Sequence, residues 1–170
     1  MVSAAQLTPK DLLAIEPQAS QSFTLGIDTR NCPPAHAEEL CAQDESWAIR
    51  HDGRLIAAFG IYENFPGQSG ICWAILSDGI GSAHLAMTRF ARSRIIGSPL
   101  RRLELFARCA DAEAILDQFP GLDTAQIVEA VLAMPTAECV WARLLGMKPA
   151  HVLRKFGASG ESVMLFERIS

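Results

Sequence analysis

The stretch 70–90 constrains the fold more than any other part of the sequence, because its pattern changes abruptly in the middle. Its first part, 70–76, is a short apolar run containing Ile and Trp, which predicts a buried strand. The run breaks at the glycine-containing segment 77–82, and apolar residues then return at helical spacing, which predicts a helix from Ala83. The chain therefore contains a strand that leads through glycines into the N-terminus of a helix.

This connection has two interpretations. The first amide groups of a helix have no acceptor within the helix, and glycines allow a ligand to approach the backbone closely. On this interpretation the segment 77–82 is an anion-binding loop. The alternative is an ordinary connection between a strand and a helix that binds nothing. The loop by itself leaves both interpretations open.

Composition narrows the class of protein. A chain of 170 residues with 49% apolar and 20% charged residues is typical of one globular domain with a substantial core. The net charge of −4 gives no electrostatic reason to expect a nucleic acid or an anionic membrane as partner. The sequence has no apolar run near the roughly 20 residues that span a bilayer, and its N-terminus does not resemble a signal peptide. We therefore expect a cytoplasmic protein, or one assembled into a particle from the cytoplasm.

The cysteines are an odd number and are scattered, at Cys32, Cys41, Cys72, Cys109 and Cys139. Several lie in apolar patterns, which indicates reduced, buried thiols rather than disulfides. The first two lie near His36, but there is no Cys-x-x-Cys pair and no obvious fourth ligand. We expect no metal site.

The remaining patterns give the order of the elements. Thr8 as cap, Pro9 at the first position and Asp11 at the third predict a helix that ends near Pro17. The segment 20–29 is ambiguous. The other expected elements are a helix at 33–43, a hairpin of 47–50 and 54–62 around Asp52-Gly53, a strand at 102–109, two short helices within 111–134 around Pro120-Gly121, a helix at 137–145 and strands at 151–156 and 162–169.

This order resembles the GCN5-related N-acetyltransferase (GNAT) fold over nearly the whole chain. The resemblance is carried by the hairpin 47–60, the strand and loop 72–82, and the segment Trp141-Ala142-Arg143-Leu144-Leu145-Gly146-Met147. It implies an α+β protein with a mixed, largely antiparallel central sheet of about six to seven strands, flanked by helices and splayed at an acyl-CoA cleft. The domain would be single, 1–170, with a helical insertion at about 111–134.

The resemblance also implies a cofactor, acetyl-CoA or another acyl-CoA, lying in the cleft where two central strands separate. The pantetheine would bind the backbone of one strand, and the pyrophosphate would bind the amides of the loop that follows it. The strand residues would be Ala74, Ile75 and Leu76, and the loop residues Asp78, Gly79, Ile80, Gly81 and Ser82.

The chain departs from the family pattern at two places. Of the family's Gln/Arg-x-x-Gly-x-Gly/Ala loop it keeps only Gly79-Ile80-Gly81, without the preceding basic or amide residue. The family's tyrosine, four residues before the glycine that ends the closing helix, corresponds to Ala142, and the chain's single tyrosine is Tyr62.

Two residues are candidates for acid–base catalysis. Glu63 follows a strand expected to border the substrate side, so it is the candidate general base; the alternative is a solvated loop carboxylate. His84, in the first turn of the expected helix, is a weaker alternative, because a histidine there also serves as a cap or a hydrogen-bond partner. Trp73 and Trp141 fall on apolar phases of their elements and are expected in the core.

Two functions follow. The first is an acyl-CoA-dependent N-acyltransferase of a small amine or a protein amine, with weak or lost activity. The second is a non-catalytic GNAT-fold component of a phage virion, because the segments 73–77 and 141–147 resemble small phage and prophage proteins of this kind. The apolar residues within 111–134 predict an interface, either with a second copy of the chain or with phage structural proteins.

Overall fold

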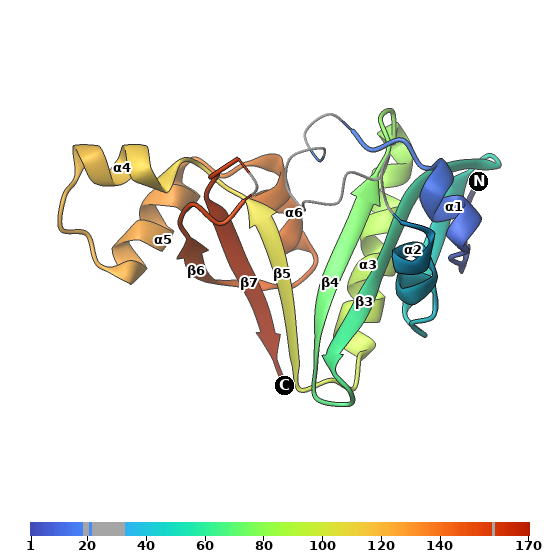
Figure 1. Cartoon of the computed structure of the whole chain (residues 1–170). Helices are drawn as coiled ribbons and strands as arrows, with labels where there is room; N and C mark the ends of the chain where they lie inside the picture. The colour runs from blue at the N-terminus through green and yellow to red at the C-terminus, as the bar shows by residue number, and fades with distance from the viewer. Residues whose placement is uncertain (19–20, 22–32, 158) are drawn as a thin grey trace.

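A seven-stranded sheet forms the centre of the protein in the computed structural model, which describes residues 1–18, 21, 33–157 and 159–170 (Figure 1). The strand order is β1-β2-β3-β4-β5-β7-β6, and β4 and β5 are the parallel pair in an otherwise antiparallel sheet. The elements are β1 (Val2–Gln6), α1 (Pro9–Ala14), α2 (Pro34–Cys41), β2 (Ser46–His51), β3 (Arg54–Phe65), β4 (Ser69–Leu76), η3 (Gly81–Ala83), α3 (His84–Gly97), β5 (Arg102–Arg108), α4 (Ala112–Gln118), α5 (Thr124–Ala133), α6 (Ala137–Leu144), β6 (Lys148–Leu153) and β7 (Val163–Ile169). This arrangement confirms the predicted α+β fold.

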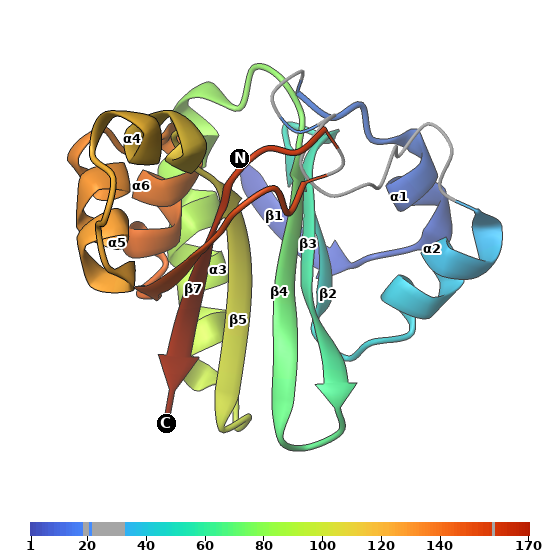
Figure 2. The ribbon, with the colours of Figure 1, turned by 60° about the vertical axis from the view of Figure 1, so that its left-hand side comes forward.

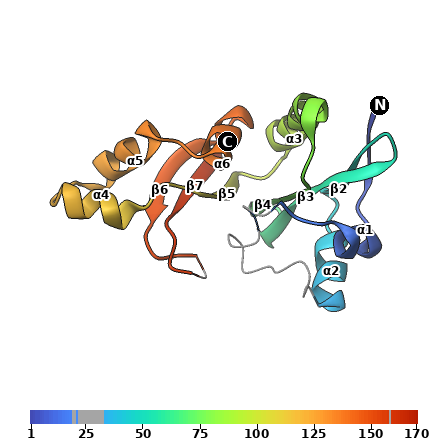
Figure 3. The same cartoon turned by 90° about the horizontal axis from the view of Figure 1, so that it is seen from above.

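Helices cover the two faces of the sheet unequally. α3 and α6 lie on one face, and α1 and α2 lie on the other, beneath β2, β3 and β4 (Figures 2 and 3). The larger core is under α3 and α6 and includes the fully buried Met87, Leu103 and Phe166. A smaller core under α1 and α2 includes Leu12 and Leu40. No helix in the described ranges is long and apolar enough to cross a membrane.

Local sequence signals account for the early elements. The Thr8 hydroxyl accepts from the Asp11 N–H at 3.2 Å, and Pro9 opens α1, as the capping pattern predicts. At the β2–β3 turn, Asp52 and Gly53 have φ angles of 50° and 82°, which suit a tight hairpin turn. These predictions are confirmed.

Two strands differ from expectation. β1 is not predicted, because four of its five residues are exposed and small or polar; it forms by pairing with β2, Val2 opposite His51 and Gln6 opposite Trp47. β6 begins at Lys148 rather than at residue 151, since an irregularity after Pro149 lets the edge strand include a proline.

The insertion contains two helices, α4 and α5, as predicted. Asp111 caps α4, and Asp123 and Gln126 form a capping box at the start of α5. α5 packs against β6, beyond the sheet's edge (Figure 3). Phe119, at the end of α4, and Met134, at the end of α5, remain exposed.

The parallel pair β4–β5 determines where a ligand can enter. The two strands pair over 69–72 and 102–105, and beyond these residues they diverge (Figure 1). At the open end each strand has lost its neighbour on one side, so its backbone groups face a gap in the sheet. The cleft predicted from the resemblance lies at this gap.

Candidate functional site

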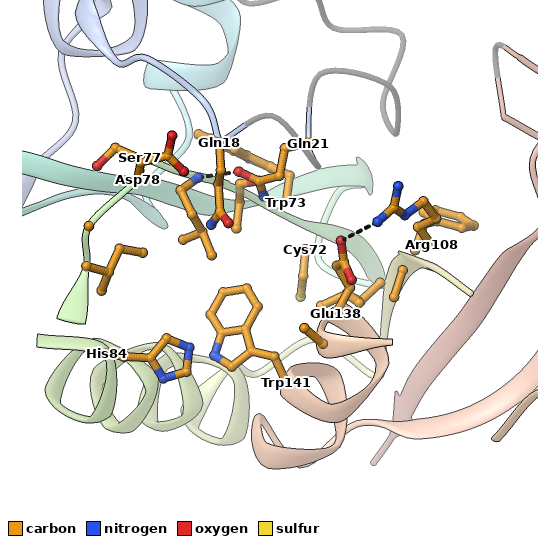
Figure 4. Close-up of a pocket in the computed structure, with 18 of the residues that line it drawn as sticks. Gln18, Gln21, Cys72, Trp73, Ser77, Asp78, His84, Arg108, Glu138 and Trp141 are labelled. Atoms are coloured by element: carbon orange, nitrogen blue, oxygen red, sulfur yellow. Dashed lines mark hydrogen bonds and ion pairs between the residues drawn. The ribbon is translucent and has the colours of Figure 1, made fainter. Parts of the chain in front are cut away.

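A cavity of about 340 Å³ occupies the gap between β4 and β5. Its walls come from β4 and the loop after it, from the open end of β5, from the first turn of α3 and from α6 (Figure 4). Gln18 and Gln21, between α1 and α2 in the sequence, close one side. The cavity therefore brings together segments that lie far apart along the chain.

The glycine loop after β4 forms one end of the cavity. Gly79 and Gly81 have φ angles of 76° and 52°, so both occupy conformations that glycine adopts most easily. Ile80, the cap position of η3, makes no side-chain hydrogen bond to it, and the N–H groups of Gly81 and Ser82 lie in the first turn of η3, which runs directly into α3. Asp78, Gly79 and Ile80 line the cavity, while Gly81 and Ser82 lie exposed beside it. The loop thus presents uncapped amides at the cavity's end.

An arginine from another strand supplies positive charge to this loop. The Nη2 atom of Arg54 donates to the carbonyl of Asp78 at 2.9 Å. A Cβ atom added to Gly79 would lie 3.7 Å from Arg54 Nη1. Arg54 begins β3, and the antiparallel register with β4 places that end of β3 beside the loop. No local sequence signal points to this residue, because its position depends on strand pairing.

The open edge of β4 is formed by alternate residues. The Ser77 N–H donates to Ile56 of β3 at 3.0 Å, so Ser77 and Ile75 direct their backbone toward β3. Ala74 and Leu76 direct theirs toward the cavity, and both residues line it. Ile75 does not: its backbone faces the neighbouring strand, and its buried side chain belongs to the core under α1 and α2. The structure therefore does not bring Ile75 to the cavity with Ala74 and Leu76.

Two glutamines occupy the open edge of β4. The Gln21 side chain accepts from the Leu76 N–H at 2.6 Å and donates to the Ala74 carbonyl at 3.2 Å. The backbone N–H of Gln18 donates to the Leu76 carbonyl at 2.8 Å. Gln21 belongs to the segment 20–29, which was ambiguous in the sequence, and Gln18 lies just before it. The other residues of that segment, and Cys32, lie outside the described ranges.

The wall opposite β4 contains an aromatic side chain and an imidazole. The Trp141 indole N–H donates to the Thr88 hydroxyl at 2.9 Å, and His84 Nδ1 lies 3.5 Å from the same oxygen. The two rings point into the cavity side by side, with centroids 6.2 Å apart (Figure 4). Trp141 and Trp73 are half-buried, and each packs against one of the two cores, as expected, while also lining the cavity.

An ion pair also lines the cavity. Arg108, at the end of β5, lies 3.6 Å from Glu138 in the first turn of α6 (Figure 4). The Thr136 hydroxyl caps α6 and donates to the Arg108 carbonyl at 2.6 Å, which fixes the two elements together. Sequence reasoning missed this pair, since its members lie on separate elements.

Glu63 lies away from the cavity. It is near the β3–β4 turn, where its carboxylate accepts from the Gly67 N–H at 2.8 Å. That turn is at the end of the sheet where β4 and β5 are paired, whereas the cavity is at the open end. The structure therefore brings His84, but not Glu63, to the cavity.

Two buried residues limit the chemistry of the cavity. Burial raises the pKa of the Cys72 thiol to about 12, so this cavity-lining cysteine is not a thiolate at neutral pH. Ala142 is fully buried in the core under α3, and it brings no hydroxyl to the position of the family's tyrosine.

Solved structures of acetyltransferases share this fold. No protein-family model and no curated protein sequence matches the chain. The aminoglycoside 6'-N-acetyltransferase from Enterococcus faecium superposes with a TM-score of 0.67 at 10% identity, over 98% of this chain and 96% of that one. Ard1 from Thermoplasma volcanium gives 0.63 at 12% identity, over 99% and 97%.

An aminoglycoside 6'-N-acetyltransferase complexed with coenzyme A gives a TM-score of 0.66 at 8% identity, over 98% of this chain and 96% of that one. Identities this low establish a shared fold and no more. The fold is that of the GNAT acetyltransferases, end to end along the chain.

Proposed function

We propose that the protein is an acyl-CoA-dependent N-acyltransferase that acts on a small amine or a protein amine. One observation carries the proposal: the sheet opens between β4 and β5, and the open edge of β4 leads directly into an uncapped helix N-terminus. An extended chain of amides ending in phosphates is complementary to this succession of groups. One solved structure of the same fold contains coenzyme A.

The described residues suit each part of acyl-CoA. The amides after Ile80 and the Arg54 guanidinium offer hydrogen bonds and positive charge to a pyrophosphate. The backbone groups of Ala74 and Leu76 offer a donor and acceptors to pantetheine amides. Whether the acyl group is acetyl or larger depends on the wall formed by His84 and Trp141.

The reaction would be a direct transfer. The amine nitrogen attacks the thioester carbonyl, a C–N bond forms, the C–S bond breaks, and the thiolate takes up a proton. His84 is placed to accept the amine's proton, and the cleft-facing N–H of Ala74 to polarise the carbonyl. The neutral Cys72 thiol disfavours an acyl-enzyme intermediate. Without a tyrosine at residue 142, positioning must supply most of the rate enhancement.

Thermal unfolding with coenzyme A tests the cofactor part of the proposal. A ligand at about 100 times its dissociation constant stabilises the native state by roughly 2.7 kcal/mol, which for this chain length raises Tm by roughly 5–10 °C. Gly81→Asp should abolish the shift, because it adds negative charge beside the amides. Gly81→Asn is the matched control, since both residues tolerate the left-handed backbone of Gly81 and Asn carries no charge. No shift with the wild-type protein at millimolar coenzyme A would refute the proposal.

The second candidate is a non-catalytic protein of the same fold, the component of a phage particle expected above. Two observations favour loss of catalysis: Ala142 at the tyrosine position, and the occupation of the β4 edge by Gln21. A protein that binds coenzyme A but transfers no acyl group to any amine in a broad panel would support this candidate.

A further inference from the structure

We propose that the Gln21 side chain competes with acyl-CoA for the edge of β4, and that the cofactor binds only after this side chain has left. The inference rests on the proposed function and adds a built-in restraint to the same site. In the absence of ligand, the chain itself occupies the place where a ligand amide would bind.

The competition follows from the hydrogen-bonding groups involved. A pantetheine amide pairs with a strand edge through one C=O and one N–H, and the Gln21 carboxamide offers the same two groups. Its Oε1 accepts from Leu76 at 2.6 Å, and its Nε2 donates to Ala74 at 3.2 Å. Leu76 has a single backbone N–H, which cannot donate well to two acceptors at once. Ligand and side chain therefore exclude each other at this edge.

The contact also has a structural reason to exist. β4 has lost its β5 partner at Ala74 and Leu76, and Leu76 is 7% exposed, so its backbone groups have little access to water. Backbone groups left unpaired in such surroundings are destabilising. Gln21, together with the Gln18 N–H on the Leu76 carbonyl, satisfies them when no ligand is present.

Only molecules in which Gln21 has left the edge of β4 can bind the cofactor. The apparent affinity is therefore the intrinsic affinity multiplied by the fraction of such molecules. Removing the carboxamide should therefore tighten binding. We expect Gln21→Ala and Gln21→Met to bind coenzyme A about 5- to 10-fold more tightly than the wild type, as two modest hydrogen bonds allow. Gln21→Met keeps the length of the side chain, so it separates loss of the carboxamide from loss of bulk.

Gln18→Ala is the matched control. The Gln18 side chain also lines the cavity, but its bond to β4 comes from the backbone, which the substitution retains. This variant should bind coenzyme A within about twofold of the wild type. Isothermal titration with coenzyme A gives the affinities, and Tm without ligand verifies that each variant is folded. Hydrogen exchange at the Leu76 amide supplies an independent measurement: it should be faster in ligand-free Gln21→Ala than in the wild type and equally slow in both when coenzyme A is bound.

The outcomes separate this inference from the proposed function. Equal or weaker binding by both Gln21 variants, with clear binding by the wild type, overturns the competition and leaves the function standing. Equally tight binding by Gln18→Ala and the Gln21 variants also overturns it, because the effect would then not belong to the carboxamide. If neither the wild type nor any variant binds coenzyme A, both proposals fall.

Discussion

Arg54 illustrates how one residue can replace a missing motif. The glycine loop lacks the basic or amide residue of the GNAT loop pattern that it resembles, but a guanidinium from β3 donates to the Asp78 carbonyl and lies beside Gly79. A charge supplied from a neighbouring strand can serve the same phosphate as one supplied by the loop, because only its final position matters. On the proposed function, its contribution would be specific to the phosphate end of the ligand.

Arg54→Ala should weaken coenzyme A binding by roughly 5- to 30-fold, since a charge-assisted contact with phosphate is stronger than a neutral one. Pantetheine, which lacks the pyrophosphate, should bind Arg54→Ala and the wild type equally. Arg54→Lys should recover part of the affinity. Titration with the two ligands measures the difference; an equal loss for both would mean that Arg54 only supports the fold of the loop.

Among the elements, α3 is fastened to the sheet by a partly buried ion pair. Arg94 donates to both carboxylate oxygens of Glu45, just before β2, and lies over the Trp47 ring at 5.1 Å. On the same side, Phe90 meets Trp47 edge to face at 5.4 Å. Hydrogen bonds from Arg94 lower the pKa of Glu45. The pair therefore links the position of α3 to the ionisation of one carboxylate.

Because the folded-state pKa of Glu45 is lowered, its contribution to stability is present above its unfolded-state pKa of about 4.5 and is lost as pH falls through the folded-state value. Glu45→Gln should lower Tm at pH 7, and the difference from wild type should shrink progressively below about pH 4.5. Tm measured from pH 3 to pH 7 gives the curve. Glu129→Gln, at an exposed position on α5, is the control and should change Tm little at any pH. A Tm difference that stays constant with pH would contradict the assignment.

Elements that are specified by neighbouring residues in the sequence were predictable. Elements that form only through contacts with distant segments of the chain were not. Thr8 and Asp52-Gly53 determine their cap and turn by themselves, and both appear where expected. The strand–loop–helix order followed from periodicity and glycine placement, whereas the cleft was predicted only from the resemblance to the GNAT fold. β1, by contrast, is a strand only because β2 is beside it.

The site was predictable to the same extent. The loop residues and His84 are sequential neighbours of β4, so the sequence located them. Gln21, Arg54 and the Arg108–Glu138 pair reach the cleft through tertiary contacts that no local pattern encodes. Glu63 was wrongly placed because a position after a strand does not reveal which end of the sheet it occupies.

Over the whole molecule, one core joins the two halves of the split sheet. The core under α3 and α6 contains residues from β2 through β7, so it continues across the gap that the backbone ladder leaves open. A continuous core favours a single cooperative unfolding transition, even though few backbone hydrogen bonds connect the halves.

Leu103→Ala tests this continuity. Leu103 is fully buried on β5 and belongs to the shared core. Its truncation should reduce the free energy of unfolding by about 2–5 kcal/mol. Far-UV circular dichroism and the tryptophan fluorescence of a Trp141→Phe background should report the same urea midpoint; the remaining Trp47 and Trp73 lie in one half and Leu103 in the other. Separate midpoints would show that the halves unfold independently.

The short ladder between β4 and β5 also has a mechanical consequence. The paired end acts as an axis, and the displacement of any point beyond it grows with its distance from that end. Leu76 lies four residues past the last paired residue of β4, Cys72, which corresponds to a lever of roughly 13 Å at about 3.3 Å per residue. A rotation of about 10° would then move Leu76 by roughly 2 Å, about half the spacing between neighbouring strands. A slight twist at the closed end can thus change the width at the open end by about the van der Waals radius of a methyl group.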